Sequence, residues 1–225
     1  MPQTYRDFGL ILKRTDLGEA DAIVTLLTRQ EGVARAVAKG VRKLTSRKGG
    51  NVALFNHIDA LVTRGRSLDV LSEAEAIATF NIWRSDLERV SQAYYAADIT
   101  IMLLAEGETY SYIHDQLVSF YGWLGYALVP SLLVRWYEVQ LLVSLGFWAA
   151  NQMQSESQNA LTLLDSFAQE TASSVAQMRT APRLTQEMER LMRDRLVQVL
   201  ERDPKSQNFV FQVQALGERL AQGAA

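Results

Sequence analysis

Short apolar runs separated by turn-forming residues make up the first 80 residues of the chain. Residues 8–12 and 22–27 are aliphatic or β-branched runs of strand length, and similar runs follow at residues 33–39 and 52–63. Residues 68–78 favour a fifth strand, although propensity alone also allows a helix there. Five short strands in so short a stretch predict a small β-barrel.

A different period begins near residue 83, where apolar side chains recur every three or four positions, as on one face of a helix. Ser85 is the predicted N-cap of the first helix. The apolar stripe of this helix consists of Leu87, Val90, Tyr94, Ala97, Ile101 and Leu104. Residues 132–145 are apolar on nearly every side, which predicts a helix buried at the centre of a helical domain.

The remaining pattern completes the predicted architecture. Further helices are expected at residues 113–124, 161–168, 188–199 and 209–220, with a loop at residues 151–159. The predicted fold class is α+β, with a small barrel over residues 1–80 and an all-α domain over residues 81–225.

The composition excludes several kinds of chemistry. The 225 residues contain no cysteine, so disulfides, thiolate nucleophiles and cysteine-ligated zinc are excluded, and two histidines are too few to indicate a metal centre. The sequence also lacks phosphate-loop, dinucleotide-binding, nucleophile-elbow and zinc-protease motifs. It has neither a basic signal-peptide start nor a run of about 18 apolar residues, so we expect a soluble cytoplasmic protein.

Charge is distributed unevenly along the chain. Residues 1–80 carry 12 basic and 9 acidic side chains, whereas residues 84–178 carry 3 basic and 10 acidic ones. Residues 29–48 contain seven Lys or Arg and a single acid, Glu31. Such a concentration of positive charge predicts a binding site for a polyanion.

The basic residues lie on a predicted strand and on the loop that follows it. On a strand over residues 33–39, Arg35 and Lys39 would point to one face, about 13 Å apart, with the alanines between them on the other face. Glycines at both ends would let the loop over residues 40–50 wrap around a ligand. A solvated basic loop is the alternative interpretation, but a position on a small barrel favours binding of single-stranded nucleic acid.

Two other constellations could carry chemistry. Glu73 and Glu75 would share one face of a strand and could bind a divalent ion, and His57 with Asp59 could form an acid–base pair. Neither has a third ligand or a nucleophile beside it. Surface charge is therefore the favoured interpretation, and no catalytic residue is assigned.

Several stretches occur in an order and spacing that resemble one family. They are residues 5–14, 18–21, 36–43, 45–47, 64–75, 86–89, 94–95, 135–138, 145–147 and 200–206. Together they resemble the bacterial recombination mediator RecO family over most of the chain, with a weaker likeness at residues 150–180. Many relatives carry a four-cysteine zinc module after the central helix. Residues 151–159 stand in its place without a cysteine, so the module is degenerate, and neither zinc nor another cofactor is expected.

The resemblance implies a non-enzymatic DNA repair and recombination mediator whose barrel is an OB-fold. Such proteins bind single- and double-stranded DNA, anneal complementary strands coated with single-stranded-DNA-binding protein, and promote loading of the recombinase RecA together with RecR. The implied partners are thus DNA, RecR and the acidic C-terminal tail of single-stranded-DNA-binding protein, with no membrane. The implied location is the cytoplasm, at the nucleoid.

The resemblance also implies site residues. The expected DNA contacts are Arg35, Lys39, Arg42, Lys43, Arg47 and Lys48, with Arg64 and Arg66 as a second wall. About six phosphate contacts would give a log–log salt slope near −4 on single-stranded DNA. The acidic tail is expected to bind at Arg135, Trp136 and Tyr137, with an internal ion pair between Arg135 and Glu138 as the alternative.

Two other functions compete with this interpretation. The first is a protein-interaction scaffold whose barrel does not bind DNA, which would not shift a labelled oligonucleotide at low salt. The second is a metal-dependent nuclease using Glu73, Glu75 and His57, which would cleave DNA when supplied with Mg²⁺. The mediator ranks above the scaffold, and the scaffold above the nuclease.

Overall fold

The computed structural model describes residues 3–43, 46, 48–150, 157–200, 206, 210 and 213. The chain forms two compact units, and each is described by itself. The first unit consists of Met1–Phe80 and Leu104–Val118, and the second of Asn81–Leu103 and Ser119–Ala225. The unit that contains the barrel strands thus also includes a stretch that follows the first helix.

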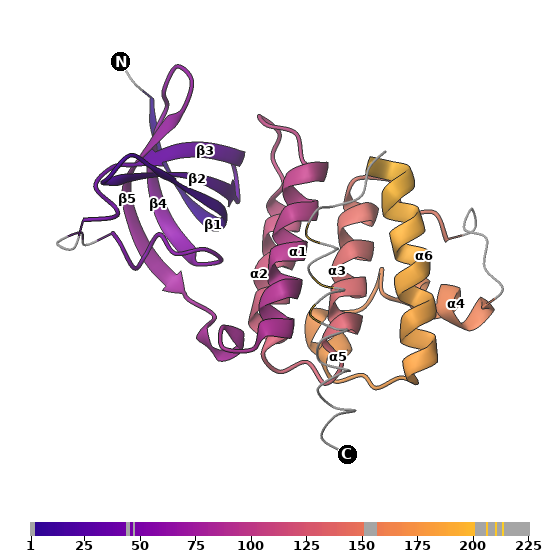
Figure 1. Ribbon diagram of the computed structural model, residues 1–225. Coiled ribbons are helices and arrows are strands. Elements are labelled where there is room, and N and C mark those ends of the chain that lie inside the picture. The colour runs from indigo at the N-terminus through magenta and orange to yellow at the C-terminus, as the bar shows by residue number, and fades with distance from the viewer. Residues whose placement is uncertain are drawn as a thin grey trace. The chain divides into compact units, whose positions relative to one another are not determined.

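The first unit contains a closed five-stranded barrel with the strand order β1-β2-β3-β5-β4 (Figure 1). Its strands are β1 (Thr4–Leu17), β2 (Asp21–Thr28), β3 (Gly32–Ala38), β4 (His57–Thr63) and β5 (Asp69–Ala78). Neighbouring strands are antiparallel except for β3 and β5, which are parallel. The predicted small barrel is confirmed. The fifth run is a strand and not a helix, because Leu71 and Ala74 are buried in the barrel core, and burial outweighs helix propensity.

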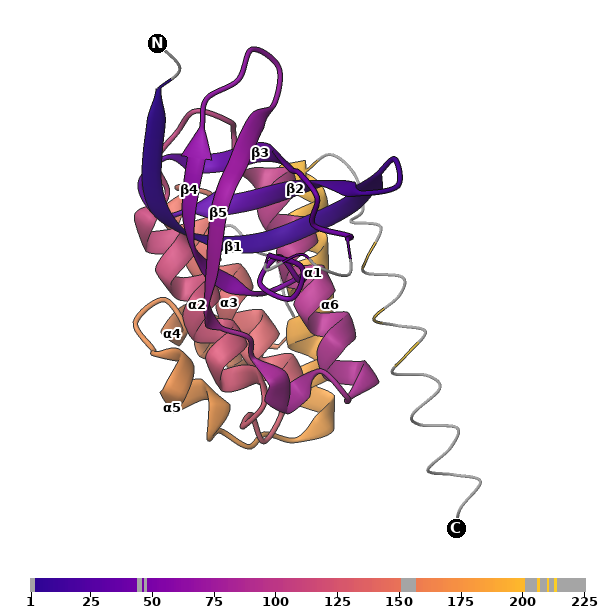
Figure 2. The same cartoon turned by 90° about the vertical axis from the view of Figure 1, so that its left-hand side faces the viewer.

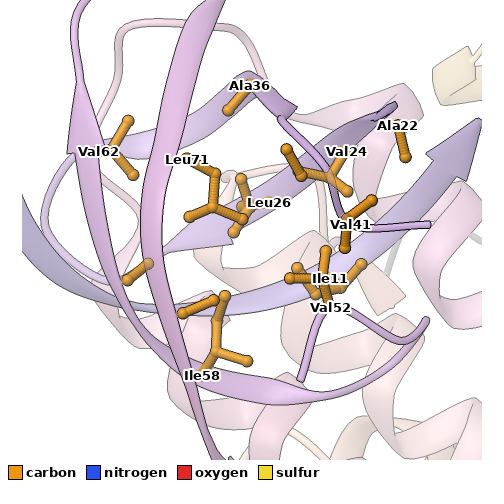
Figure 3. Packing of buried hydrophobic residues seen from close by; sticks show 13 residues of the cluster. Ile11, Ala22, Val24, Leu26, Ala36, Val41, Val52, Ile58, Val62 and Leu71 are labelled. Carbon is orange, nitrogen blue, oxygen red and sulfur yellow. The ribbon is translucent and has the colours of Figure 1, made fainter. Parts of the chain in front are cut away.

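The barrel interior follows the alternation of the strands. Val24 and Leu26 of β2 and Ala36 of β3 point inward beside Ile11, and none of the four is exposed to solvent (Figure 3). The connection between β3 and β4 adds Val41 and Val52 to the same cluster. The predicted strand over residues 52–63 is wrong in its first part, because the strand begins at His57.

Residues 104–118 pack on the outer side of the barrel. Val33 of β3 forms a parallel bridge with Glu106, and the Thr109 hydroxyl donates a hydrogen bond of 2.7 Å to the carbonyl of Gln30. Gly32 has a φ of 71°, and a Cβ atom there would lie 1.8 Å from the carbonyl oxygen of Glu108. Only glycine therefore fits at this turn between β2 and β3.

The beginning of α2 (Ser111–Leu124) continues this contact with the barrel. Arg29 donates hydrogen bonds of 3.0, 3.2 and 2.9 Å to the carboxylate of Asp115. The ring of His114 lies 5.2 Å from that of His57 on β4. Burial, and to a smaller extent the neighbouring His114, lower the pKa of His57 to about 4, so His57 is neutral at pH 7.

The second unit is a bundle of helices. Its further elements are η1 (Asn81–Trp83), α1 (Leu87–Leu103), α3 (Pro130–Ser144), α4 (Gln158–Ser166), α5 (Ala172–Ala176) and α6 (Pro182–Leu200). Residues 132–142 of α3 are all buried, and α3 contacts α1, α4, α5 and α6 (Figure 1). The predicted central helix is confirmed. Within the described part of the chain, no helix is long and apolar enough to cross a membrane.

Two details of the first helix differ from the sequence prediction. Asp86, and not Ser85, is the N-cap, since its carboxylate accepts a hydrogen bond of 3.2 Å from the Arg89 amide. Leu87 and Tyr94 of the predicted apolar stripe are 51% and 44% exposed, whereas α1 buries a face of small and polar side chains such as Ser91. The predicted loop at 151–159 and helix at 209–220 lie mostly outside the described residues.

Candidate nucleic-acid interface

Arg35 lies at the centre of the outer face of β3. The strand alternates as predicted: Ala34, Ala36 and Ala38 are buried, whereas Arg35 and Lys39 are exposed. Among the described residues, neither cation has a hydrogen bond or ion pair with another side chain. The guanidinium of Arg35 and the ammonium of Lys39 are therefore available to bind an anion from solution.

The first described residues of the loop after β3 are attached to the barrel. Its residue Arg42 donates a hydrogen bond of 2.5 Å to the carbonyl of Gly18 and forms an ion pair of 3.3 Å with Asp16. The backbone amide of Arg42 also donates to the carbonyl of Ala20, at 2.9 Å. These contacts, with the buried Val41, attach residues 41 and 42 to the turn between β1 and β2, so this part of the predicted wrapping loop is held against the barrel.

The far end of the same loop covers the edge of β5. Lys48 donates hydrogen bonds of 3.2 Å to the carbonyls of Leu71 and Ser72, and the Asn51 amide donates one of 2.9 Å to the carbonyl of Ala74. These side chains replace strand pairing along the part of β5 that β3 does not reach. Lys48 thus has a structural role in closing the barrel, which sequence spacing could not reveal.

Replacing Lys48 by Met tests this role. Met keeps the aliphatic stem but leaves two β5 carbonyls without their donor, so we expect the free energy of unfolding to fall by about 1–2 kcal/mol. Urea unfolding measures the change. The matched control is Lys43→Met, which removes an exposed ammonium and should stay within about 0.5 kcal/mol of the original chain. Equal stability of the two variants would contradict the structural role.

The two arginines predicted as a second wall lie in the loop between β4 and β5, which projects beyond the barrel (Figure 2). Arg64 forms an ion pair of 2.5 Å with Glu31 and lies over the ring of Tyr5, 4.7 Å from its centroid. Arg66 is exposed and has no such partner among the described residues. Arg64 therefore fixes the loop, while Arg66 is free to meet a ligand.

The predicted cations thus fall into separate groups. Exposed side chains without a protein partner in the described part of the chain are Arg35, Lys39, Lys43 and Arg66. Arg42, Lys48 and Arg64 bind other parts of the barrel unit. Arg47 lies outside the described residues.

The strand register adds a cation that the sequence did not single out. Lys13 of β1 lies opposite Thr25 of β2, and Thr25 lies opposite Arg35 of β3. Residues directly opposite in antiparallel strands share a face, so Lys13 and Arg35 lie on one outer face. Lys13 is exposed and unpaired among the described residues. Its sequence signal is weak, because strict alternation from the buried Ile11 would place Lys13 inside.

The outer face of β4 and β5 carries the opposite charge. Asp59 lies opposite Glu75, and Leu61 lies opposite Glu73. Arg6 joins two of these acids, at 2.9 Å from Asp59 and 3.4 Å from Glu73. The predicted pair of His57 with Asp59 is not formed, and the described residues contain no group of three or more metal-ligating side chains. The acidic side chains of this face repel a polyanion.

The predicted partner-binding residues are buried inside the helical unit. Trp136 and Tyr137 are fully buried, and Arg135 is only 6% exposed. The Arg135 guanidinium lies 2.8 Å from the carboxylate of Glu138, which is the ion pair given above as the alternative. The prediction of an exposed tail-binding surface at these three residues is wrong, because each side chain is already used in the core.

Taken together, a closed five-stranded barrel followed by a helical bundle defines an OB-fold protein with an appended helical domain. Residues 1–80 match the family model described as "Recombination protein O N terminal". The chain is 30% identical over 248 residues to DNA repair protein RecO of Roseiflexus sp. (strain RS-1), covering 95% of this chain and 87% of the relative.

Other relatives match shorter stretches at higher identity. DNA repair protein RecO of Gloeobacter violaceus is 41% identical over 116 residues, which is 52% of this chain and 44% of the relative. The protein of the same name from Nocardioides sp. is 52% identical over 77 residues, or 34% of this chain and 32% of the relative. The chain belongs to the RecO family. Its role therefore lies in DNA repair and recombination.

Proposed function

We propose that the chain binds single- and double-stranded DNA on the outer face of β1, β2 and β3 and anneals complementary strands. One observation carries this proposal: Arg35, Lys39 and Lys43 are exposed and unpaired among the described residues, although other cations of the barrel are bound by acids or carbonyls. Unpaired cations on one surface are the groups that neutralise phosphates.

The position of these cations on the fold supports the same surface. OB-folds bind oligonucleotides on the face of strands 2 and 3 and with the loops that join strands 1 to 2 and 4 to 5. Arg35 lies on that face, and Arg66 lies in the loop between β4 and β5. Because β5 begins to pair with β3 at Ala36 and Asp69, this loop approaches β3 next to Arg35.

Annealing needs charge neutralisation and strand contact, and no covalent bond is made or broken. The family resemblance extends the proposal to strands coated with single-stranded-DNA-binding protein, to RecR as a partner and to loading of RecA. With Arg135, Trp136 and Tyr137 buried, the contact for the acidic tail has no assigned residues in this proposal. Binding to DNA would also bring the protein to the nucleoid.

The test is oligonucleotide binding and annealing as a function of salt, without nucleotide. Four phosphate contacts, from Arg35, Lys39, Lys43 and Arg66, should give a log–log slope of about −3 on single-stranded DNA, and a contact by Arg47 would bring it to about −3.5. Annealing of complementary strands coated with single-stranded-DNA-binding protein should exceed the spontaneous rate. A slope near zero, or no binding at low salt, would leave the scaffold as the better explanation.

A further inference from the structure

The proposed DNA surface has cations, but its strands β2 and β3 carry no aromatic ring. Residues 9–54, which include most of β1 and all of β2 and β3, contain no Phe, Tyr, Trp or His. Phe55 itself is buried, at 3% exposure, and Phe8 lies opposite Asp59 in the part of β1 that pairs with β4. The strands β2 and β3 themselves therefore offer bases no ring on which to stack, and the ring of Tyr110 lies beside Gly32, at the opposite end of β3 from Lys39.

Lys13 reaches this face because β1 is irregular at that point. Ile11 lies opposite Leu26 and points into the core, whereas Lys13 lies opposite Thr25, with a register shift between Ile11 and Lys13. A bulge of this kind places an extra residue, Leu12, in the strand and turns the next side chain to the other face. Without the bulge, Lys13 would point into the barrel.

The resulting row of cations has dimensions suited to a sugar–phosphate backbone. Lys13 and Arg35 are separated by β2, which puts their backbones about 10 Å apart, and Lys39 lies about 13 Å from Arg35 along β3. Between the cations lie Thr25, which is only 8% exposed, and the half-buried Ile23 and Val37. None of these side chains is aromatic, so a bound base has no ring among them on which to stack.

Building on the proposed function, we infer that Lys13 is a further phosphate contact and that the β1–β2–β3 face binds the DNA backbone without stacking any base. The bases of a bound strand then remain free to pair with a second strand, which suits annealing. Such a surface also binds single strands and duplexes by the same contacts, since both present phosphates. Aromatic platforms, in contrast, favour single strands, because only unpaired bases can stack on them.

An abasic oligonucleotide tests the absence of stacking. We expect the full chain to bind an abasic strand and an oligothymidine strand of equal length with dissociation constants within about twofold, because the phosphates are the same. Stacking contributes enough per base that its loss from a binding site would weaken the abasic strand by about tenfold or more. Such a loss would overturn the inference.

Two variants of Lys13 test its contact. Lys13→Gln should reduce the steepness of the log–log salt slope on single-stranded DNA by about 0.7, and Lys13→Arg, which keeps the charge, should leave the slope unchanged. If Lys13→Gln has the same salt slope as the original chain and an intact fold by circular dichroism, Lys13 makes no phosphate contact.

The same experiment separates failure of the inference from failure of the proposed function. If the chain binds oligothymidine but not the abasic strand, DNA binding stands and the backbone-only mode is wrong. If the chain binds neither strand at low salt, the proposed function is wrong and the inference falls with it. Tight binding to both oligonucleotides, with a salt slope that changes in Lys13→Gln but not in Lys13→Arg, supports the proposed function and the inference.

Discussion

Reversing the charge of Arg35, Lys39 and Lys43 together to Glu is expected to weaken binding to single-stranded DNA by about 100-fold or more at moderate salt. Each substitution removes a phosphate contact and adds an anion that repels the backbone. Since the three side chains are exposed and unpaired among the described residues, the fold should be unaffected. Fluorescence anisotropy of a labelled oligonucleotide measures the affinity, and thermal unfolding checks the fold.

The matched control keeps every charge. Arg35→Lys, Lys39→Arg and Lys43→Arg combined should bind DNA to within a few-fold of the original chain, because phosphate attraction depends mainly on charge here. Arg42 is left out of the set because it is bound to Asp16 and Gly18, so its reversal would disturb the fold as well as the surface. A folded triple-Glu variant with undiminished DNA affinity would rule out this surface.

The barrel could be predicted from the sequence because its signals are local. The alternation in β3 placed Arg35 outside and its flanking alanines inside, and the structure has the same arrangement. Strand-length apolar runs separated by turns also gave the correct number of strands. These features depend on neighbouring residues, which a sequence displays directly.

The partners of the cations could not be predicted, because they come from distant parts of the chain. Lys48 binds carbonyls of β5 that follow it by more than 20 residues, and Arg64 binds Glu31, which precedes it by 33. The bulge at Leu12 has no sequence signature, so the exposure of Lys13 appeared only with the strand register. Local charge density identified the region of the site, but not which cations are free.

The helical unit shows the same limit. A stripe of larger apolar residues, including Leu87 and Tyr94, predicted the buried face of α1, yet both are exposed. The helix instead buries Ala93 and Ala96, together with Ala97 of the predicted stripe, in the unit that contains α3. Small side chains allow two helices to approach closely, and the larger polar Tyr95 is accommodated because its hydroxyl donates to Glu138 at 2.5 Å.

The Glu138 network leads to the prediction with the largest effect on stability. Arg135→Ala should lower the free energy of unfolding by about 3–5 kcal/mol, because it leaves the carboxylate of Glu138 buried without its cation. The carboxylate is 2.8 Å from the Arg135 guanidinium and is fully buried. Urea unfolding measures the loss. A change below about 0.5 kcal/mol, as for an ordinary surface substitution, would contradict the buried ion pair.

The pH dependence of this variant identifies the unpaired charge as the cause. Burial raises the pKa of Glu138 to about 7 from an ordinary 4.5, although Arg135 and the hydrogen bond from Tyr95 both lower it. Removing Arg135 raises the pKa further, so the folded state binds a proton that the unfolded state releases above pH 4.5. The stability of Arg135→Ala should therefore rise as the pH is lowered from above 7 towards 4.5. The double variant Arg135→Ala with Glu138→Gln lacks the titrating carboxyl group. The difference in the free energy of unfolding between the single and the double variant should therefore shrink as the pH falls over that range.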